Sequence, residues 1–235
     1  MKIYLAGSSH TPVKELKEMG VKNKLYSFHG ETTKAIQWGG EGLMLDSGAY
    51  SVFTRGVTIN IDQLIEFINF VKPDAAIQLD VIGDSQKTYE NYVYMKQKIP
   101  NVLPVVHFNM SDSYISKMVD STDYLLLGGL VSQRGQWKLI TEWLDYLYTK
   151  YKLHTKKVHL LGITKKNLLE RYPAYSSDST TWLSGNRYPQ PNYTMGKINQ
   201  KNKDYYELEK DGFNKIRELE QHITKLWESR GIKWD

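Results

Sequence analysis

The chain has 235 residues, of which 40% are hydrophobic, a formal net charge of +5 and no cysteine. This length suits one domain, residues 1–235, and the 17 Tyr, 6 Trp and 6 Phe exclude a disordered polymer. Without cysteine, disulfides, thiolate catalysis and cysteine-bound metal clusters are excluded. No apolar run approaches the roughly 18 residues of a membrane span, and the first ten residues lack the apolar core of a signal peptide. We therefore predict a soluble, cytoplasmic protein with no membrane partner.

Eight short runs rich in β-forming residues recur along the chain, and most of them precede a helical pattern. Several runs are almost wholly apolar, which is typical of parallel strands that are buried on both faces. The predicted strands are Lys2–Ala6, Lys24–Phe28, Gly42–Asp46, Ala75–Val81, Leu103–Phe108, Tyr124–Gly128, Lys157–Ile163 and Ala174–Ser179.

Amphipathic helices are predicted between these strands. One begins at Asn60, which with Gln63 resembles a capping box, and ends before Pro73. A terminal helix is predicted over residues 204–231 from apolar residues at helical spacing. Residues 184–203 are rich in Gly, Pro and Asn, which predicts a long loop before that helix.

Eight strands that alternate with helices in a chain of this length predict an α/β fold, namely a single (β/α)₈ TIM-like barrel with an additional C-terminal helix. A doubly wound open sheet is the alternative. In such barrels, functional residues gather at the C-terminal ends of the strands. The chemically useful residues at these positions are Asp46, Asp80, His107, Gly128, Gly129 and Asp178.

Two of these acids suggest chemistry at a sugar carbon. Asp46 ends the run Leu-Met-Leu-Asp before Ser-Gly-Ala-Tyr, and Asp178 lies in Ser-Ser-Asp-Ser-Thr-Thr-Trp. At one barrel mouth, one carboxylate attacks C1′ or stabilises positive charge there, while the other exchanges a proton with the leaving base. The alternative is that each acid caps a helix or a turn, as most aspartates at strand ends do.

The other residues at strand ends admit more than one role. Asp80 is suited to accept hydrogen bonds from a purine-like ring, and magnesium ligation is a rival role. His107 and His159 lie in apolar strands, where a histidine is either a satisfied core residue or a ligand. Gly128 and Gly129 allow a ligand edge near the backbone, or only a tight exit from the strand. With no HExxH spacing, P-loop or GxGxxG motif, we predict no metal, nucleoside triphosphate or dinucleotide site.

Positive charge is concentrated in residues 150–200. They hold nine Lys and Arg against Glu170 and Asp178, a local net charge of +7, and the rest of the chain has −2. Clustered cations favour a polyanionic partner because they displace the counterions condensed on phosphates. A lysine-rich solvated surface is the alternative. The residues predicted to contact nucleic acid are Lys165, Lys166, Trp182 and Arg187, where Trp182 either stacks on a base or packs against the barrel rim.

Six short motifs in a fixed order resemble those of the tRNA-guanine transglycosylase superfamily. Asp46-Ser47-Gly48-Ala49-Tyr50 resembles the Asp-Ser-Gly-Gly-aromatic motif of that superfamily. The others are Leu79-Asp80-Val81-Ile82-Gly83-Asp84, Val106-His107, Leu127-Gly128-Gly129-Leu130, His159-Leu160-Leu161-Gly162-Ile163 and Tyr175-Ser176-Ser177-Asp178-Ser179-Thr180-Thr181-Trp182. The resemblance covers residues 1–190 and is closer to the short phage and modification-island relatives, which exchange guanine in DNA for a 7-deazaguanine.

The resemblance implies a role for each matching residue. It implies that Asp178 is the nucleophile that attacks C1′ and that Asp46 is the general acid/base. The residues implied to bind the base are Ser47, Tyr50, Asp80, His107, Gly128, Gly129 and Leu161.

Within that group, the resemblance assigns contacts to individual side chains. Asp80 binds the pyrimidine-like edge of the base, and Gly129 offers its backbone. Tyr50 and Leu161 sandwich the flat ring. His107 stands where the tRNA enzymes have a base-contacting Gln.

The sequence also departs from the tRNA enzymes. Their Cys/His zinc subdomain cannot form without cysteine, and the chain is much shorter. The resemblance therefore favours DNA over tRNA as the partner of a guanine or 7-deazaguanine base, implies no cofactor, and leaves open an oligomer or an accessory subunit.

Three alternative functions remain for this chain. They are a tRNA-guanine transglycosylase, a non-catalytic nucleic-acid-binding subunit on the same barrel, and a nucleosidase or glycoside hydrolase with the same two carboxylates. Inactive partner subunits often lose a catalytic acid, whereas Asp46 and Asp178 are both present.

Overall fold

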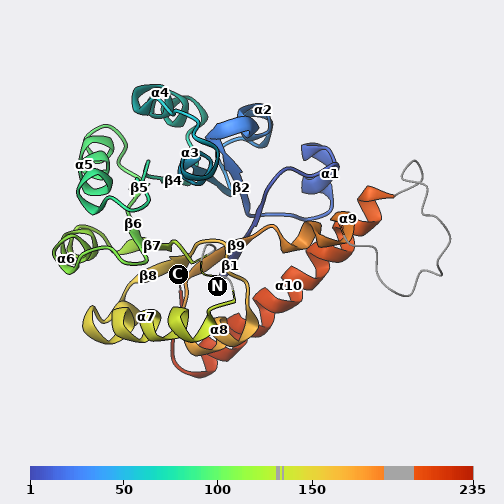
Figure 1. Ribbon diagram of the computed structural model, residues 1–235. Coiled ribbons are helices and arrows are strands. Elements are labelled where there is room, and N and C mark those ends of the chain that lie inside the picture. Colours follow the sequence, from blue (N-terminus) through green and yellow to red (C-terminus); the bar gives the residue numbers. More distant parts are fainter. Residues whose placement is uncertain (131–132, 134, 188–203, 235) are drawn as a thin grey trace.

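The computed structural model describes residues 1–130, 133, 135–187 and 204–234, with the backbone alone at 186 and 187 (Figure 1). Within these residues, parallel strands form one sheet that is surrounded by helices. The strands are β1 (Lys2–Ala6), β2 (Lys24–Ser27), β3 (Leu43–Asp46), β4 (Ala75–Ile77), β5 (Val102–Leu103), β6 (Val105–His107), β7 (Tyr124–Gly128), β8 (Lys157–Leu160) and β9 (Ser176–Ser179).

Helices connect and cover these strands. The α-helices are α1 (Val13–Glu18), α2 (Phe28–Trp38), α3 (Ala49–Arg55), α4 (Ile61–Val71), α5 (Ser85–Lys96), α6 (Asp112–Asp120), α7 (Trp137–Lys150), α8 (Lys166–Arg171), α9 (Ser184–Arg187) and α10 (Tyr205–Ser229). Two 3₁₀ turns, η2 (Leu153–Thr155) and η3 (Thr181–Leu183), precede β8 and follow β9. No helix of the described residues combines the length and hydropathy needed to cross a membrane.

The strand order identifies a barrel and excludes the doubly wound sheet. Hydrogen-bonded neighbours run β5-β4-β3-β2-β1-β9-β8-β7-β6, so the first strand lies beside the last. In the β1–β9 ladder, Tyr4 is opposite Asp178. A ring in which each strand adjoins its sequence neighbour is the order of a TIM-like barrel, and the predicted fold class is therefore confirmed.

One seam in the barrel lies at Pro104, between β5 and β6. The predicted strand Leu103–Phe108 is divided there because proline has no N–H to donate to a ladder. The same segment still contacts both neighbours: Leu103 O accepts from Gln78 N at 3.2 Å, and Pro104 O accepts from Leu126 N at 2.9 Å. The barrel is thus nearly closed, with nine short strands among the described residues instead of the predicted eight.

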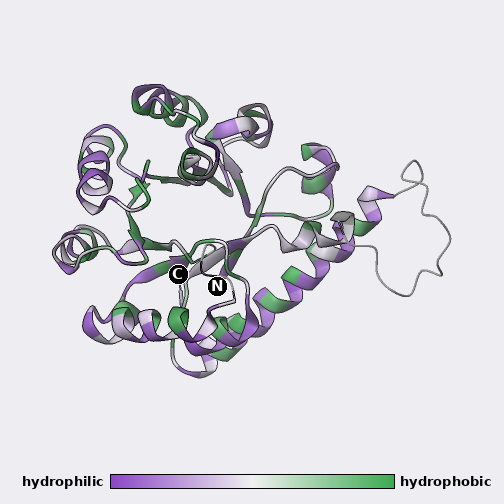
Figure 2. Cartoon of the chain, in the orientation of Figure 1, coloured by the Kyte–Doolittle hydropathy of each residue, from purple (hydrophilic) through white to green (hydrophobic). Residues whose placement is uncertain are grey.

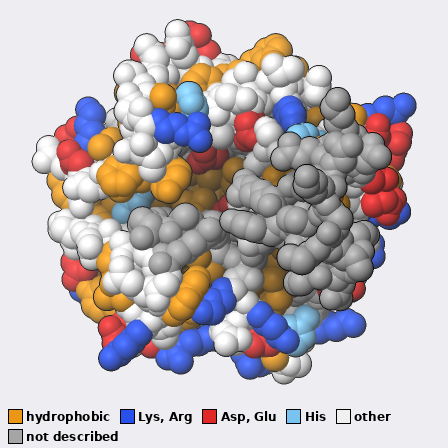
Figure 3. Space-filling view, turned by 45° about the vertical axis from the view of Figure 1, so that its right-hand side comes forward, with side chains coloured by type: hydrophobic (Ala, Val, Ile, Leu, Met, Phe, Trp, Pro, Cys, Tyr) orange, Lys and Arg blue, Asp and Glu red, His pale blue; other side chains and the backbone are white. Residues whose placement is uncertain are grey.

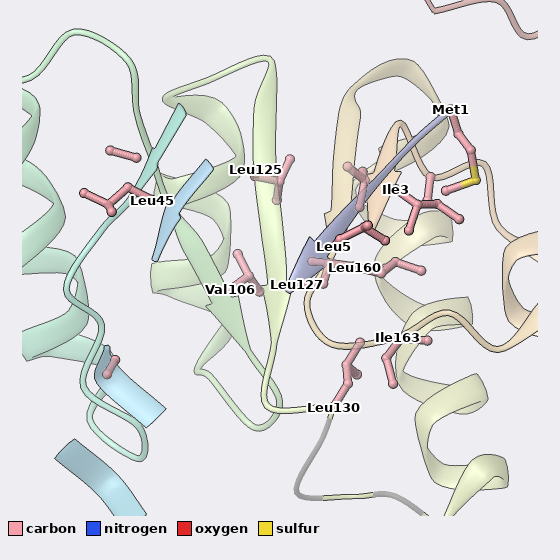
Figure 4. Close-up of a cluster of buried hydrophobic side chains, with 14 of the residues drawn as sticks. Met1, Ile3, Leu5, Leu45, Val106, Leu125, Leu127, Leu130, Leu160 and Ile163 are labelled. Carbon is pink, nitrogen blue, oxygen red and sulfur yellow. The ribbon is translucent and has the colours of Figure 1, made fainter. Parts of the chain in front are cut away.

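Alternating side chains along the strands divide the core into two clusters. The cluster inside the barrel comprises Tyr4, Ala6, Leu25, Met44, Ala75, Ile77, Leu103, Val105 and Leu126. The larger cluster lies between the barrel and the helices, and Figure 4 shows part of it, including Ile3, Leu5, Leu125, Leu127 and Leu160. The surrounding helices carry both hydrophobic and hydrophilic residues (Figure 2), as amphipathic helices on a barrel must.

Two predictions about local structure can be compared with the helices. The Asn60 side chain caps α4, because its Oδ1 accepts from Asp62 N at 2.9 Å and from Gln63 N at 3.1 Å. The predicted loop over 184–203 is wrong at its start, since its first four residues form α9. The rest of that prediction, at 188–203, lies outside the described residues.

Helix α10 is joined to the first strand and to the loop after it by buried and partly buried hydrogen bonds. Glu220 Oε2 accepts from Ile3 N at 2.5 Å. The carboxylate of Glu209 accepts from His10 N at 2.8 Å and Thr11 N at 3.1 Å. These contacts, between residues about 200 positions apart in sequence, attach α10 to β1 and to the loop that follows it.

We predict that Gly212→Ala destabilises the protein, although alanine is normally favoured over glycine by about 0.5–1 kcal/mol within a helix. A Cβ on Gly212 would lie 1.9 Å from the carbonyl oxygen of Trp182, which belongs to the backbone of η3. Relieving that overlap should cost about 1–3 kcal/mol in the free energy of unfolding, measured by urea denaturation. Gly185→Ala is the control, since its Cβ would meet Leu208 Cδ2 at 3.5 Å, an ordinary contact. A Gly212→Ala variant as stable as the parent would contradict this packing.

Candidate active site

The C-terminal ends of the strands carry a group of acids and histidines. Asp46 is the last residue of β3, His107 the last of β6, and Asp178 the third residue of β9, while Asp80 follows β4. Because the strands are parallel, these residues lie at the same end of the barrel. In Figure 3 a hollow opens near the centre of the visible face, with hydrophobic and acidic side chains inside it.

Asp178 is held at one of its two carboxylate oxygens. The side chain is 9% exposed, and Oδ1 accepts from Gly162 N at 2.7 Å and lies 3.1 Å from His159 Nε2. No described residue forms a hydrogen bond with Oδ2. Two polar contacts on one oxygen fix the carboxylate and leave the other oxygen available for reaction.

Asp46 lies in a different environment. Burial raises the pKa of its carboxyl group to about 7, and the negative charges of Asp80 and Asp178 act in the same direction. Hydrogen bonds from the Ser27 side chain and from Gly48 N, the latter at 3.0 Å to Oδ2, only partly offset that rise. An acid with this pKa can both donate and accept a proton near neutral pH.

Asp80 and His107 form a close pair at the same mouth. Nε2 of His107 lies 2.6 Å from Oδ2 of Asp80, and both side chains are 8% exposed. The two atoms lie within ion-pair distance but without hydrogen-bond geometry, and neither ring nitrogen of His107 has a hydrogen-bond partner among the described residues. The pair therefore retains unused hydrogen-bonding capacity, which a ligand edge can satisfy.

A small pocket of about 110 Å³, with both polar and apolar residues in its lining, lies against His107. His107 and the segment after it line one wall, and the segment from Val81 to Ser85 lines the other. The pocket places additional hydrogen-bonding groups, including Asp84 and Asn109, beside the candidate base-binding residues.

Gly128, the last residue of β7, and Gly129, which follows it, occupy tight positions. A Cβ on Gly128 would lie 2.8 Å from Val105 Cγ1 and 3.3 Å from Leu161 Cδ1. Gly129 has φ +77°, which side chains rarely tolerate, and its Cβ would lie 3.2 Å from Phe108. The structure therefore requires glycine at both positions for packing, whatever their role toward a ligand.

The other predicted base-binding residues lie on separate elements. Leu161 packs against the interior cluster, and Ser47 is buried with no hydrogen-bond partner for its Oγ among the described residues. Tyr50 lies at the start of α3 and is 54% exposed. The sandwich of a base between Tyr50 and Leu161 remains a prediction.

The residues predicted to contact nucleic acid are mostly engaged within the protein. Lys165 Nζ lies 3.6 Å from the centroid of the Trp137 ring, and Lys166 forms an ion pair of 3.7 Å with Glu170. The side chain of Arg187 lies outside the described residues. The phosphate-binding role of these residues stays a prediction.

The stacking role considered for Trp182 is wrong for this conformation. Its side chain is 1% exposed, and Nε1 donates to the Ala6 carbonyl oxygen at 2.8 Å. A ring that is enclosed by the barrel and by α10 presents no face to a base, so Trp182 packs against the rim, the alternative role.

Several polar residues that support these acids were not predicted from the sequence. Tyr124 and Ser176 connect to His159 inside the barrel. Lys24 is fully buried, donates to the carbonyl oxygens of Leu5 and Gly7, and has its pKa lowered by burial to about 7. The sequence feature that could have revealed these residues is a polar side chain within a strand expected to be buried. Such a side chain is costly unless it has a hydrogen-bond partner.

Neither metal-binding geometry nor similarity to known proteins adds an assignment to the site. Among the described residues, no group of three or more His, Asp or Glu side chains could hold a metal ion. No family model and no curated protein matches the chain. The resemblance to the transglycosylases therefore rests on its short sequence motifs alone.

We predict that Asp46→Asn changes how stability depends on pH. Because the pKa of Asp46 is raised in the folded state from about 3.9 in an unfolded chain, the folded protein binds more protons between pH 4 and 7. This group therefore makes the free energy of unfolding fall as pH rises through that window, and then level off. The stability of Asp46→Asn relative to the parent should increase from pH 4 to 7, measured by urea denaturation.

Asp211→Asn, which removes an exposed carboxylate on α10, is the matched control. If the parent and Asp46→Asn gave parallel pH profiles, the pKa of Asp46 would not be raised as described.

Proposed function

We propose that this protein is a nucleobase-exchange transglycosylase that replaces guanine in a polynucleotide, with DNA favoured over tRNA, by a 7-deazaguanine. The observation that carries the proposal is the contrast between two carboxylates at one barrel mouth. Asp46 has a raised pKa, whereas one oxygen of Asp178 is held by a backbone N–H and a histidine. Two carboxyl groups in contrasting environments are typical of an acid/base and nucleophile pair.

The first half of the exchange breaks the bond between guanine and the sugar. Oδ2 of Asp178 attacks C1′ and forms an ester while the C1′–N9 bond breaks. Protonated Asp46 gives its proton to the departing guanine and becomes a carboxylate. The raised pKa of Asp46 supports this step, because a substantial fraction of the group is protonated near pH 7.

The second half reverses the first with another base. A 7-deazaguanine enters and gives the proton on N9 to the Asp46 carboxylate. Its N9 attacks C1′, and the ester bond to Asp178 breaks. Each residue returns to its starting state, the configuration at C1′ is retained, and no redox or organic cofactor takes part.

The close pair of Asp80 and His107 suits recognition of the base. A carboxylate accepts from the N–H groups along one edge of guanine, and the imidazole can serve the neighbouring oxygen or nitrogen. Both side chains are enclosed, so these contacts would be made away from water. This role agrees with the position of both residues in the motifs that resemble the family.

A nucleosidase or glycoside hydrolase is the second candidate, and one observation favours it. Lys165 and Lys166 are engaged with Trp137 and Glu170, and Trp182 is buried. Among those three residues, Trp182 therefore offers a polynucleotide no contact, whereas Lys166 keeps 58% of its side chain exposed. A small nucleoside would use the same two carboxylates, with water in place of the incoming base.

We predict that the protein incorporates labelled guanine into DNA and that Asp178→Asn lowers the rate by more than about 10³-fold, because no nucleophile remains. Asp46→Asn should lower it by about 10²–10⁴-fold through loss of proton transfer. Asp123→Asn, an exposed carboxylate, is the control. Each variant is assayed with DNA, tRNA and free nucleosides.

Incorporation of label into tRNA alone would identify tRNA as the substrate. Hydrolysis of nucleosides, with no label incorporated into DNA or tRNA, would favour the second candidate. Near-normal exchange by Asp178→Asn would contradict the nucleophile assignment.

We also predict that neutralising Lys165, Lys166 and Arg187 together weakens binding to DNA. The dependence of log affinity on log salt should flatten by up to about 2.7 units on duplex DNA, at about 0.9 unit for each phosphate that the variant no longer neutralises. The affinity for free base should not change, because these side chains are expected to face phosphate. An unaltered salt dependence would place the polynucleotide on another face.

A further inference from the structure

Four polar side chains form a continuous chain of contacts through the interior of the barrel. The Tyr124 hydroxyl lies 2.7 Å from Ser176 Oγ, which lies 2.7 Å from His159 Nδ1. The other ring nitrogen, Nε2, lies 3.1 Å from Asp178 Oδ1. Tyr124 begins β7 and Asp178 lies near the end of β9, so the chain leads from the N-terminal end of the barrel strands towards the mouth at their C-terminal end.

The direction of each hydrogen bond follows from Asp178 as a carboxylate, whose Oδ1 already accepts from Gly162 N beside His159 Nε2. A carboxylate can only accept, so His159 Nε2 must carry the hydrogen. In a neutral imidazole Nδ1 is then an acceptor, and the Ser176 hydroxyl donates to it. The Ser176 oxygen in turn accepts from Tyr124, which remains protonated because burial raises its pKa well above the usual value.

This chain occupies a place that barrels usually fill with apolar side chains. Ser176 and His159 are both fully buried, and the ring of Tyr4 packs edge-on against that of His159 at 6.0 Å. Buried polar groups are costly unless each has a partner. Here each polar side chain has the next one as its hydrogen-bond partner, and these partners restrict His159 to one tautomer and one orientation.

The fixed orientation of His159 in turn restricts the carboxylate of Asp178. His159 Nε2 and Gly162 N hold Oδ1 from the side chain and from the backbone. Together they set the rotation of the carboxylate about its final bond. Oδ2 is left without a partner among the described residues and is presented for attack.

We infer that His159, fixed by Ser176 and Tyr124, is a positioning residue that orients Asp178 so that Oδ2 faces the substrate. The kinetic part of this inference rests on the proposed function, in which Asp178 is the nucleophile. The hydrogen-bond chain itself does not rest on that function and can be measured without any substrate.

The first experiment determines the tautomer of His159 in the resting protein, from the ¹⁵N shifts of its ring nitrogens at pH 7.5. We expect the Nε2–H tautomer, and we expect Ser176→Ala and Tyr124→Phe to weaken that preference. Tyr148→Phe, which alters another buried tyrosine whose hydroxyl bonds to Pro173 O, is the matched control. An Nδ1–H tautomer in the parent would overturn the inference.

The second experiment compares His159→Gln with His159→Leu in the base-exchange assay. Glutamine can still present an N–H to Asp178, whereas leucine fills similar space without a donor. We expect His159→Leu to lower kcat by up to about 10²-fold with little change in KM for the base, and His159→Gln to retain most of kcat. Equal kcat values for the two variants, both folded by circular dichroism, would overturn the positioning role.

The two measurements separate failure of the inference from failure of the proposed function. If the parent shows no exchange on any substrate while His159 has the Nε2–H tautomer, the proposed function fails and the hydrogen-bond chain stands. If exchange is normal and the tautomer is reversed, the proposed function stands and the inference fails.

Discussion

The pairing of the first strand with the last is the contact on which the rest of the structure depends. β1 and β9 align over four residue pairs, which places Asp178 opposite Tyr4 and closes the ring of parallel strands. Hydrogen bonds from the first strand and the loop after it to Glu209 and Glu220 attach α10 to the β1 side of this pairing. Without the pairing of β1 with β9, the fold would not bring Asp46 and Asp178, which are 132 positions apart in sequence, to the same barrel mouth.

Closure also creates the low-polarity interior that distinguishes the two carboxylates. Both lie at strand ends, yet burial and the nearby charge of Asp80 raise the pKa of Asp46 despite its hydrogen bonds from Ser27 and Gly48 N, while one oxygen of Asp178 is held by His159 and by Gly162 N. The difference arises from the residues on neighbouring strands, since the two acids are chemically the same. A reaction that needs both a proton carrier and a nucleophile can use that difference directly.

Much of the fold could be predicted from the sequence, because it depends on local pattern. Apolar runs alternating with helices indicated the strand order, and parallel strands then required Asp46 and Asp178 to converge. The features that were missed depend on distant contacts. Trp182 is buried through a carbonyl oxygen 176 positions away, and no local pattern reports that contact. Tyr124 was predicted only as part of a strand, since its partner Ser176 lies 52 positions further on.

The central claim is that Asp178 forms a covalent bond to the sugar, and the most direct test is to isolate that bond. The wild-type protein is mixed with guanine-containing DNA in the absence of free base, quenched in denaturing acid, and digested for mass spectrometry. The account predicts that the peptide containing Asp178 carries a sugar linked to the DNA, with one guanine lost, and that Asp178→Asn carries none. An adduct on another residue, or turnover without any adduct, would contradict it.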